Sequence, residues 1–445
     1  MHRQMVLNAF LMGVGHHEAA WRLPESNPHA NVDLAHYQHL ARTAEAGRMD
    51  SVFFADSPSL MSSPARRPAE ALDPTLLLAA MSAVTEQVGL IATASTTYEE
   101  PFNLARKFAS LDHLSGGRAG WNIVTTAAAD AAANFGLETM PTHAARYERA
   151  REFIEVVLRL WASWDEDAVV ADKVAGIYAD PQRVRPIDHV GGQFSVRGPL
   201  NVSRSVQGRP VLVQAGSSPT GIELAAEYAE AVFTAQRTLE DAQEFYARLK
   251  NATAEAGRDP GNIKILPGLV PILGGTEAEA HALEQSLDDL MVHEHALKQL
   301  SGSVGIPVAE LDLDQPLPDK VADVAEIEDN KSRYALTVTM ARREGLTVRQ
   351  LLNRLGGGRG HRTLAGTPEQ VADSLEQWFT QGAADGFNIM PAVLPSGLDA
   401  FVSEVVPILQ KRGLFREEYT GATLRDHYRL PQDSGLGSRS LRSAG

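Results

Sequence analysis

Two patterns of apolar residues alternate along most of this chain. Short apolar runs rich in branched residues are typical of strands that are buried on both faces. Such runs predict strands at residues 5–12, 51–56, 88–94, 119–126, 210–215, 231–235, 263–273 and 386–391. Between the runs, apolar residues recur at helical spacing, which predicts amphipathic helices. Strands that alternate with helices indicate a parallel sheet, and this number of strands favours a closed (β/α)8 TIM barrel over an open sheet.

Start and stop signals delimit the predicted helices. Asp33 is a plausible N-cap, Pro74 and Pro101 stand where a first-turn proline is tolerated, and the glycines at 116–117 end the helix that follows Pro101. Helices are therefore expected at residues 34–47, 73–86, 101–114, 142–161, 220–229, 239–256, 276–300, 368–379 and 398–412.

Two long segments interrupt this succession. Residues 165–209 contain repeated Val, Gly and Pro in short alternating runs, which is typical of a hairpin or lid inserted between barrel units. Residues 301–360 are expected to be irregular, with a flexible glycine-rich loop at 356–360. We therefore expect one barrel domain over residues 1–432 with these two insertions, followed by a flexible tail at 433–445.

The stretch from residue 88 to residue 126 is the most informative part of the chain. It reads as a strand, a helix and a second strand, and polar residues stand at the ends of both strands, among them Thr93 and Asn122. In a parallel barrel, polar groups at the carboxyl ends of strands face the active site. Both residues are therefore candidates for ligand contacts.

Composition excludes several classes of function. A formal net charge of −15 argues against non-specific binding to nucleic acid and to an anionic membrane surface. The absence of cysteine excludes disulfides, cysteine–metal sites and thiol nucleophiles. The chain shows neither a signal peptide at its start nor an apolar run of about 18 residues, so a cytoplasmic protein is expected.

Three polar residues follow the first two predicted strands. His16 and His17 are adjacent in GHHEAAWR, so they cannot both point the same way on a regular element, and they are a poor metal signal. Each could be a loop residue or a pocket residue that donates a hydrogen bond or a proton. Asp56 ends the second strand, where it could cap the next loop or, with Phe54, line a pocket beside a planar ring.

Two further patterns suit a phosphate group. His143 and Tyr147 lie four residues apart and share one face near a helix start. Ser217 and Ser218 close the fifth strand and open a helix, where backbone N–H groups and hydroxyls can hold a monophosphate. A solvated helix face and a simple serine N-cap are the alternatives. Since no hydrolase, zinc-protease or Walker motif is present, the chemistry is expected to come from a cofactor, and flavin mononucleotide (FMN) suits these groups.

Several stretches together identify a family resemblance that covers nearly the whole chain. They are GHHEAAWR, VFFAD, NFGLE, RYERAREF, LVQAGSSPTG, GTPEQVAD, DGFNIM and the long ATASTTYEEPFNLARKFASLDHLSGGRAGWNIVT. On these residues the chain resembles the flavin-dependent monooxygenases of the bacterial luciferase-like superfamily. Within it, the chain is most similar to the group of nitrilotriacetate, dibenzothiophene-sulfone and pristinamycin monooxygenases.

The resemblance implies a TIM barrel with luciferase-type insertions and the use of reduced FMN and dioxygen. A separate NAD(P)H-dependent flavin reductase would supply the reduced FMN, and the family forms homodimers or homotetramers. Positions that match family FMN contacts are Asp56, Thr93, His143, Tyr147 and Ser218, with Asn122 and Ser217 as further candidates. Phe10, His16 and Phe54 match pocket positions, and the HHE arrangement leaves His16 or His17 open as the catalytic histidine. No metal is implied.

The expected reaction is hydroxylation of a small organic molecule, or cleavage of a C–N or C–S bond after oxygenation. An aminopolycarboxylate substrate would need cations at the pocket mouth, for which Arg22, Arg66 and Arg67 are candidates, whereas a sulfone or alkane would need apolar groups. A deazaflavin-dependent oxidoreductase of the same superfamily and a non-catalytic flavin-binding protein are the alternative functions.

Overall fold

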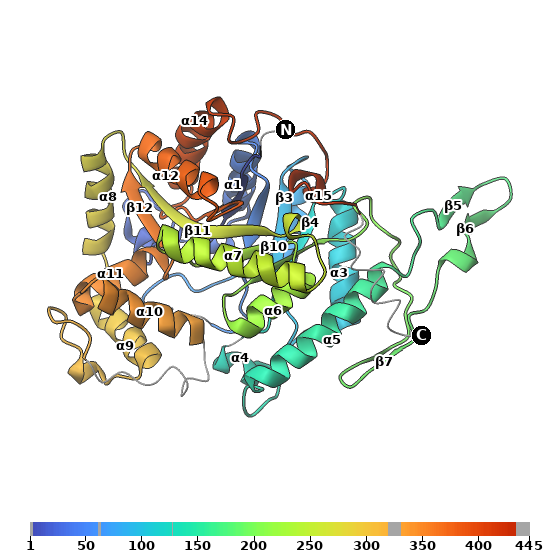
Figure 1. Ribbon diagram of the computed structural model, residues 1–445, viewed down its shortest axis with the longest axis horizontal. Coiled ribbons are helices and arrows are strands. Elements are labelled where there is room, and N and C mark those ends of the chain that lie inside the picture. The colour runs from blue at the N-terminus through green and yellow to red at the C-terminus, as the bar shows by residue number, and fades with distance from the viewer. Residues whose placement is uncertain (1–2, 61–63, 127, 319–330, 433–445) are drawn as a thin grey trace.

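The computed structural model describes residues 3–60, 64–126, 128–318 and 331–432. Eight strands form a closed ring in which every neighbouring pair is parallel, including the pairs β10–β11 and β1–β13 that close it. This confirms the (β/α)8 barrel and all eight predicted strands (Figure 1). Their bounds are β1 Val6–Phe10, β2 Ser51–Phe54, β3 Gly89–Ser95, β4 Ala119–Val124, β9 Val211–Ala215, β10 Ala231–Thr234, β11 Lys264–Leu273 and β13 Gly386–Ile389.

Helices surround the ring, and most begin where the sequence predicts. Asp33 caps the first of them by accepting hydrogen bonds from the backbone N–H groups of Ala35 and His36, and Asp73 caps the second in the same way. The last predicted helix is continuous but contains one π-helical turn, Phe401–Val405. The bounds are α1 Leu34–Ala46, α2 Pro74–Ser82, α3 Pro101–Leu114, α4 Ala129–Asn134, α5 His143–Trp161, α6 Pro219–Tyr228, α7 Leu239–Glu255, α12 Pro368–Thr380, α13 Ser396–Ala400, α14 Val406–Lys411 and α15 Leu424–His427.

The core has two shells because successive strand residues point to opposite faces of the sheet. The outer shell lies between strands and helices, where Trp121 of β4 contacts Phe108 of α3 and Phe153 of α5. The inner shell fills the barrel and includes Phe10 and Phe53. Alternation therefore decides which side chains can reach the active-site end of the barrel.

The insertion at residues 165–209 forms two antiparallel hairpins, which confirms the hairpin interpretation. They are β5 Val169–Asp172 with β6 Ile177–Ala179, and β7 His189–Val190 with β8 Ser195–Val196. The first hairpin extends well away from the barrel (Figure 1), and its strand residues are mostly exposed. It therefore adds little to the barrel core.

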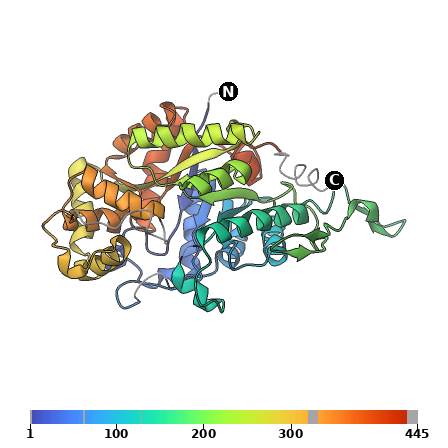
Figure 2. The same ribbon diagram turned by 60° about the horizontal axis from the view of Figure 1, so that its bottom comes forward.

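The expectation of irregular structure over residues 301–360 is wrong for the described part of that segment. Residues 276–300 form two helices rather than one, and among the described residues a short 3-10 helix, Val308–Glu310, two α-helices and a strand follow. The bounds are α8 Glu277–Asp289, α9 His293–Val304, α10 Lys331–Arg343, α11 Val348–Gly358 and β12 Arg362–Gly366. The glycine run predicted as a flexible loop is the buried last turn of α11. These helices share a small core of their own beside the barrel (Figures 1 and 2), so their apolar residues do not follow the barrel rhythm.

Among the described residues, no helix has both the length and the apolar character needed to cross a membrane. The predicted tail at 433–445 lies outside the described residues.

Candidate functional site

Three aromatic side chains line the inside of the barrel close to its carboxyl-terminal end. Phe10, Phe53 and Phe233 stand at or near the ends of β1, β2 and β10, and we call them the aromatic floor. The ring centroids of Phe10 lie 4.6 Å from Phe53 and 5.3 Å from Phe233. The Phe10–Phe233 pair packs edge to face at 83°, whereas Phe10 and Phe53 are tilted by 36°, and both contacts restrict the ring orientations. The floor is thus a rigid apolar surface that faces the strand ends where barrel enzymes bind their substrates.

The placement of Phe54 does not support the prediction that it lines the pocket. Phe54 lies on the outer face of β2, where its ring packs 5.6 Å from that of Tyr37 on α1. Phe53, one residue earlier, takes the inner position. Because side chains alternate along a strand, an offset of one residue moves an aromatic ring from the pocket into the outer core.

His16 lies at the edge of the aromatic floor. It is fully buried, its ring contacts Phe10 at 4.7 Å, and its Nε2 lies 2.8 Å from the Phe10 carbonyl oxygen. Since a carbonyl can only accept, Nε2 carries the proton, and Nδ1 is left as an acceptor with no partner among the described residues. Burial and the nearby Arg359 lower the pKa of His16 to about 3. The ring is therefore neutral near pH 7 and offers a lone pair rather than a proton.

His17 has a different role. Its Nδ1 accepts a hydrogen bond from the Ala19 N–H at 3.1 Å, and its Nε2 faces an oxygen of Asp288 on α8 at 3.4 Å. Both ring nitrogens are therefore engaged, Nδ1 within the loop after β1 and Nε2 between that loop and α8. The structure thus separates the two adjacent histidines, and only His16 presents an unused nitrogen.

Thr93 and Asn122 form a linked pair on the neighbouring strands β3 and β4. The Thr93 hydroxyl donates to the Phe54 carbonyl and accepts from the Asn122 amide, each at 2.8 Å. The Oδ1 atom of Asn122 is buried without a hydrogen-bond partner among the described residues. A buried polar atom of this kind costs free energy unless a ligand or water satisfies it. Asn122 is therefore ready to accept a hydrogen bond from a bound molecule.

Asp56 follows β2 and is exposed at the strand-end side of the barrel. Partial desolvation, and next the nearby carboxylate of Asp73, raise the pKa of Asp56. A hydrogen-bond donor on a ligand would therefore stabilise the ionised form of this carboxyl group.

The amino terminus of α6 meets α5 in a corner that suits a phosphate. Ser218 is the N-cap of α6, and its hydroxyl accepts from the Gly221 N–H at 3.1 Å. A Cβ atom at Gly221 would lie 3.0 Å from Ser218 Oγ and 3.4 Å from Tyr147 Oη, so both hydroxyls converge on this glycine. The rings of His143 and Tyr147 are 4.6 Å apart, and Ser217 is half-buried on the same turn as Ser218. We call this group the phosphate corner.

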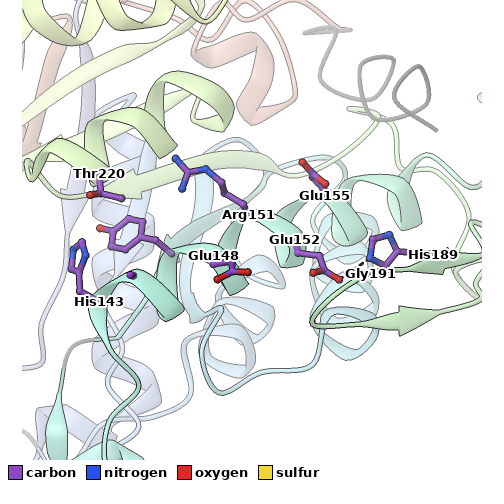
Figure 3. Close-up of a pocket in the computed structure, with 10 residues that line it drawn as sticks. His143, Glu148, Arg151, Glu152, Glu155, His189, Gly191 and Thr220 are labelled. Carbon is purple, nitrogen blue, oxygen red and sulfur yellow. Dashed lines mark hydrogen bonds and ion pairs between the residues drawn. The ribbon is translucent and has the colours of Figure 1, made fainter. Parts of the chain in front are cut away.

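An open groove of about 660 Å³ leads away from the phosphate corner along α5. His143, Tyr147 and Thr220 line its inner end, and His189 and Gly191 line the other (Figure 3). The groove is an extension of the corner and not the barrel mouth itself.

Charged residues in the middle of this groove are largely engaged. Arg151 pairs with Glu227 at 3.1 Å, and Glu152 accepts from His189 and from the backbone of the β7–β8 hairpin. Glu152 thereby fastens the second hairpin to α5, and the groove keeps its shape.

His361 is a site residue that the sequence patterns missed. It follows α11, and its ring stacks on Phe233 with centroids 4.8 Å apart and an interplanar angle of 3°. This packing requires Gly268 on β11, because a Cβ there would lie 2.4 Å from His361 Nδ1 and 2.9 Å from the Phe233 ring. The signal that could have revealed it is the isolated glycine within an apolar strand, which marks a close approach.

The donors and acceptors of the site fit a flavin nucleotide better than a metal ion. No group of three or more metal-ligating side chains is found among the described residues. In contrast, the phosphate corner, the unsatisfied Asn122 Oδ1 and the aromatic floor offer places for a phosphate, a polar ring edge and an apolar ring face.

Comparisons with known proteins agree with a site for a flavin nucleotide. The family model described as luciferase-like monooxygenase matches residues 15–385. The chain is 48% identical to N-acetyl-S-(2-succino)cysteine monooxygenase of Bacillus subtilis (strain 168), over 96% of this chain and 97% of that protein. It is 46% identical to nitrilotriacetate monooxygenase component A of Aminobacter aminovorans, with the same coverage of each chain. A riboflavin lyase solved with modified FMN and riboflavin superposes with a TM-score of 0.85 at 31% identity, over 98% of this chain and 99% of that one.

Proposed function

We propose how the site works from the premise that the chain belongs to the luciferase-like monooxygenase family. The chain is a flavin-dependent monooxygenase that uses reduced FMN and dioxygen. Its homologues are two-component enzymes, which implies a separate flavin reductase as a partner. The finer assignments that follow concern this chain's own residues.

The FMN phosphate binds at the phosphate corner, where Ser218, Tyr147 and His143 surround the first turn of α6 and Ser217 lies beside them. The convergence of two hydroxyls on Gly221 is the observation that carries this proposal. Positive backbone N–H groups at a helix start favour a phosphate there. The flavin itself supplies the oxygen chemistry, while the protein holds and orients it.

The ring system of FMN lies between the phosphate corner and the aromatic floor. Asn122 accepts a hydrogen bond through its unsatisfied Oδ1, Thr93 holds the Asn122 amide in place, and Asp56 faces the ligand from the end of β2. Apolar walls in this region exclude water, which protects reactive species from wasteful decay.

His16 acts as a hydrogen-bond acceptor through Nδ1. Its other nitrogen is held by the Phe10 carbonyl, so the ring cannot turn without losing that bond. A neutral imidazole with a fixed tautomer can accept a hydrogen bond from an N–H or O–H group of a bound molecule, but its low pKa makes it a weak base near pH 7. His17 supports this role by fixing the loop.

The substrate is a small organic acid, and oxygenation beside its heteroatom leads to hydroxylation or to C–N or C–S cleavage. Two relatives at 46% and 48% identity are named for carboxylate-bearing compounds, nitrilotriacetate and N-acetyl-S-(2-succino)cysteine. A homodimer or homotetramer is the expected assembly, which light scattering of the purified protein tests.

Anaerobic titration with reduced FMN, followed by an oxygen pulse in a stopped-flow spectrometer, tests the function. We expect tight binding of reduced FMN, and about 5- to 10-fold weaker binding for both Ser218→Ala and Tyr147→Phe, since each removes one hydrogen bond to an anion. A folded protein that binds a reduced deazaflavin but not reduced FMN would overturn the proposal. Binding without any substrate-dependent oxygen use would instead indicate a flavin-binding protein.

A further inference from the structure

A third polar side chain, that of Gln214, borders the phosphate corner. Gln214 is the next to last residue of β9 and is only 3% exposed. A Cβ atom at Gly221 would lie 3.6 Å from Gln214 Nε2, and the two nearer atoms are the hydroxyl oxygens of Ser218 and Tyr147. The amide of Gln214 therefore stands on the same side of the first turn of α6 as these two hydroxyls.

The space beside the Gln214 amide is open toward Gly216. This glycine is exposed in the loop between β9 and α6. Apart from its chain neighbours, a Cβ atom at Gly216 would meet one heavy atom of the described residues within 4 Å, which is Gln214 Nε2 at 3.3 Å. A ligand atom can therefore approach this nitrogen from the side of Gly216.

The orientation of the Gln214 amide is fixed by one hydrogen bond. Its Nε2 donates to the Ala215 carbonyl at 3.0 Å, and the reversed amide would place two acceptor oxygens against each other. An amide nitrogen carries two N–H groups, so one remains for a further acceptor. The Oε1 atom is buried and has no hydrogen-bond partner among the described residues. The fold therefore leaves both a donor and an acceptor of this side chain unused.

The place of Gln214 along β9 argues against a purely structural role. Leu212, two residues earlier, belongs to the outer core between strands and helices, and side chains two apart on a strand point the same way. An apolar side chain would fill such a position without the free-energy cost of an unsatisfied acceptor. A glutamine is better explained by a ligand that brings both an acceptor and a donor to this turn.

We propose that Gln214 is a further FMN-binding residue, at the junction of the phosphate and the ribityl chain. Its second amide N–H donates to an oxygen of the phosphate held by Ser218 and Tyr147, and its Oε1 accepts from the ribityl hydroxyl next to the phosphate. The amide thereby gains the two hydrogen bonds that the fold leaves unmade. The proposal rests on the proposed function, because it takes the phosphate corner as the place where FMN binds.

Anaerobic titration of the full-length protein with reduced FMN and with reduced riboflavin, followed by tryptophan fluorescence at about pH 8, tests the proposal. The ratio of the riboflavin dissociation constant to that of FMN isolates the contribution of the phosphate, because the two flavins differ in nothing else. We expect Gln214→Met, which keeps the side-chain length, to lower this ratio about 5- to 10-fold. Gln214→Glu should lower it by at least about 30-fold, since the carboxylate lacks the N–H and repels the phosphate.

Two further variants complete the series. Gly216→Ala leaves Gln214 in place but fills the open space beside its amide, so it should also lower the ratio. Gln243→Met is the matched control, because the Gln243 amide likewise donates to a backbone carbonyl, that of Gln381 at 2.8 Å, but lies on α7 outside the corner. It should leave the ratio unchanged. Circular dichroism verifies that each variant is folded.

Three outcomes would overturn the proposal. The first is an unchanged ratio in the folded Gln214 variants. The second is an equal fall of the ratio in Gln214→Met and Gln214→Glu, which would mean that Gln214 only braces the Ala215 carbonyl. The third is an unchanged ratio in Gly216→Ala, which decides the matter even where the Gln214 variants do not fold. The proposed function fails separately, when reduced FMN does not bind to the wild type.

Discussion

The two ends of the barrel differ in how they hold their buried charged side chains. At the amino-terminal end, Glu230 is fully buried and pairs with Arg209 at 2.8 Å and with the buried Arg425 at 2.7 Å. Nearby, the buried Asp50 pairs with Arg416. Arg416 and Arg425 both come from the last part of the chain. At the carboxyl-terminal end, His16 Nδ1 and Asn122 Oδ1 have no partner in the described structure.

This contrast separates groups that stabilise the fold from groups that await a ligand. A buried charge without its counter-charge is very costly, so the closed end of the barrel depends on complete ion pairs. Buried polar atoms without a partner among the described residues also occur near the amino-terminal end, at Arg425 Nε and His427 Nδ1, so such an atom points to a ligand only where a candidate binding site lies beside it. Polar residues at the two ends are therefore expected to respond differently to substitution, in stability at one end and in binding at the other.

The largest effect is expected at the closed end, for Glu230→Gln. Removing this carboxylate leaves two buried guanidinium groups facing each other, which should cost about 3–5 kcal/mol of unfolding free energy. Chemical denaturation followed by circular dichroism measures the loss. A loss below about 1 kcal/mol would show that the two ends do not differ as argued.

Gly268→Ala is expected to have the next largest effect, because it tests the packing beneath His361. The new Cβ would lie 2.4 Å from His361 Nδ1 and 2.7 Å from Met390 Sδ, so the stacked pair of His361 and Phe233 must shift. Overpacking of this kind costs about 1–3 kcal/mol. We expect substrate turnover to fall more than FMN affinity, measured by steady-state kinetics and fluorescence titration.

Gly302→Ala serves as the control for that substitution. Gly302 lies in α9, and a Cβ there would meet nothing within 4 Å. An alanine in a helix interior is about 0.5–1 kcal/mol more favourable than glycine, so this variant should be slightly more stable and fully active. Equal behaviour of the two variants would argue against a special role for the contact at Gly268.

Sequence patterns predicted the closed ring well because each barrel strand is an apolar run bounded by turns. They failed at residues 331–358, where α10 and α11 bury their apolar residues in a small separate core. The patterns also assigned Phe54 rather than Phe53 to the pocket. A run of apolar residues buried on both faces does not show which residue points inward. The end of β4 was easier, because Asn122 is a polar residue within an apolar strand.

The site could be predicted only where its residues belong to local motifs. Ser218 and Tyr147 could be proposed as site residues because helix starts have recognisable signals. The stacking of His361 on Phe233 depends on a contact between segments far apart in the chain, which no local pattern contains. Which of His16 and His17 faces the pocket is decided by Asp288, more than two hundred residues away in sequence.

The pH dependence of stability should report the burial of His16. Its pKa is about 3 in the folded protein and near 6.5 when the chain is unfolded, so between these values the unfolded state binds the additional proton. The stabilising contribution is therefore present above about pH 6.5 and is lost as the pH falls toward 3, by at most about 1.4 kcal/mol per pH unit.

Replacing His16 with Gln should flatten this dependence, as measured by urea denaturation between pH 4 and pH 7, a range set by the two pKa values. The comparison variant is His29→Gln, because the His29 side chain is exposed and makes no ion pair among the described residues, so the slope should stay unchanged. A slope that His16→Gln does not alter would mean that His16 is accessible to protons in the folded state, and its assignment as a fixed acceptor would be wrong.

The smallest difference in stability is expected between variants of the two adjacent serines of the phosphate corner. It tests most finely whether residues at this end of the barrel affect stability or binding. Ser218 both caps α6 and faces the corner, so Ser218→Ala should cost about 1 kcal/mol of stability in addition to its effect on FMN affinity. Ser217 makes no such cap, so Ser217→Ala should stay within about 0.5 kcal/mol of the wild type. Thermal unfolding with and without FMN separates the effect on intrinsic stability from the effect on FMN affinity. A ligand adds more stability the more tightly it binds. If Ser217→Ala reduced FMN affinity as much as Ser218→Ala, the phosphate would be held by the whole turn before α6 and not by the N-cap hydroxyl.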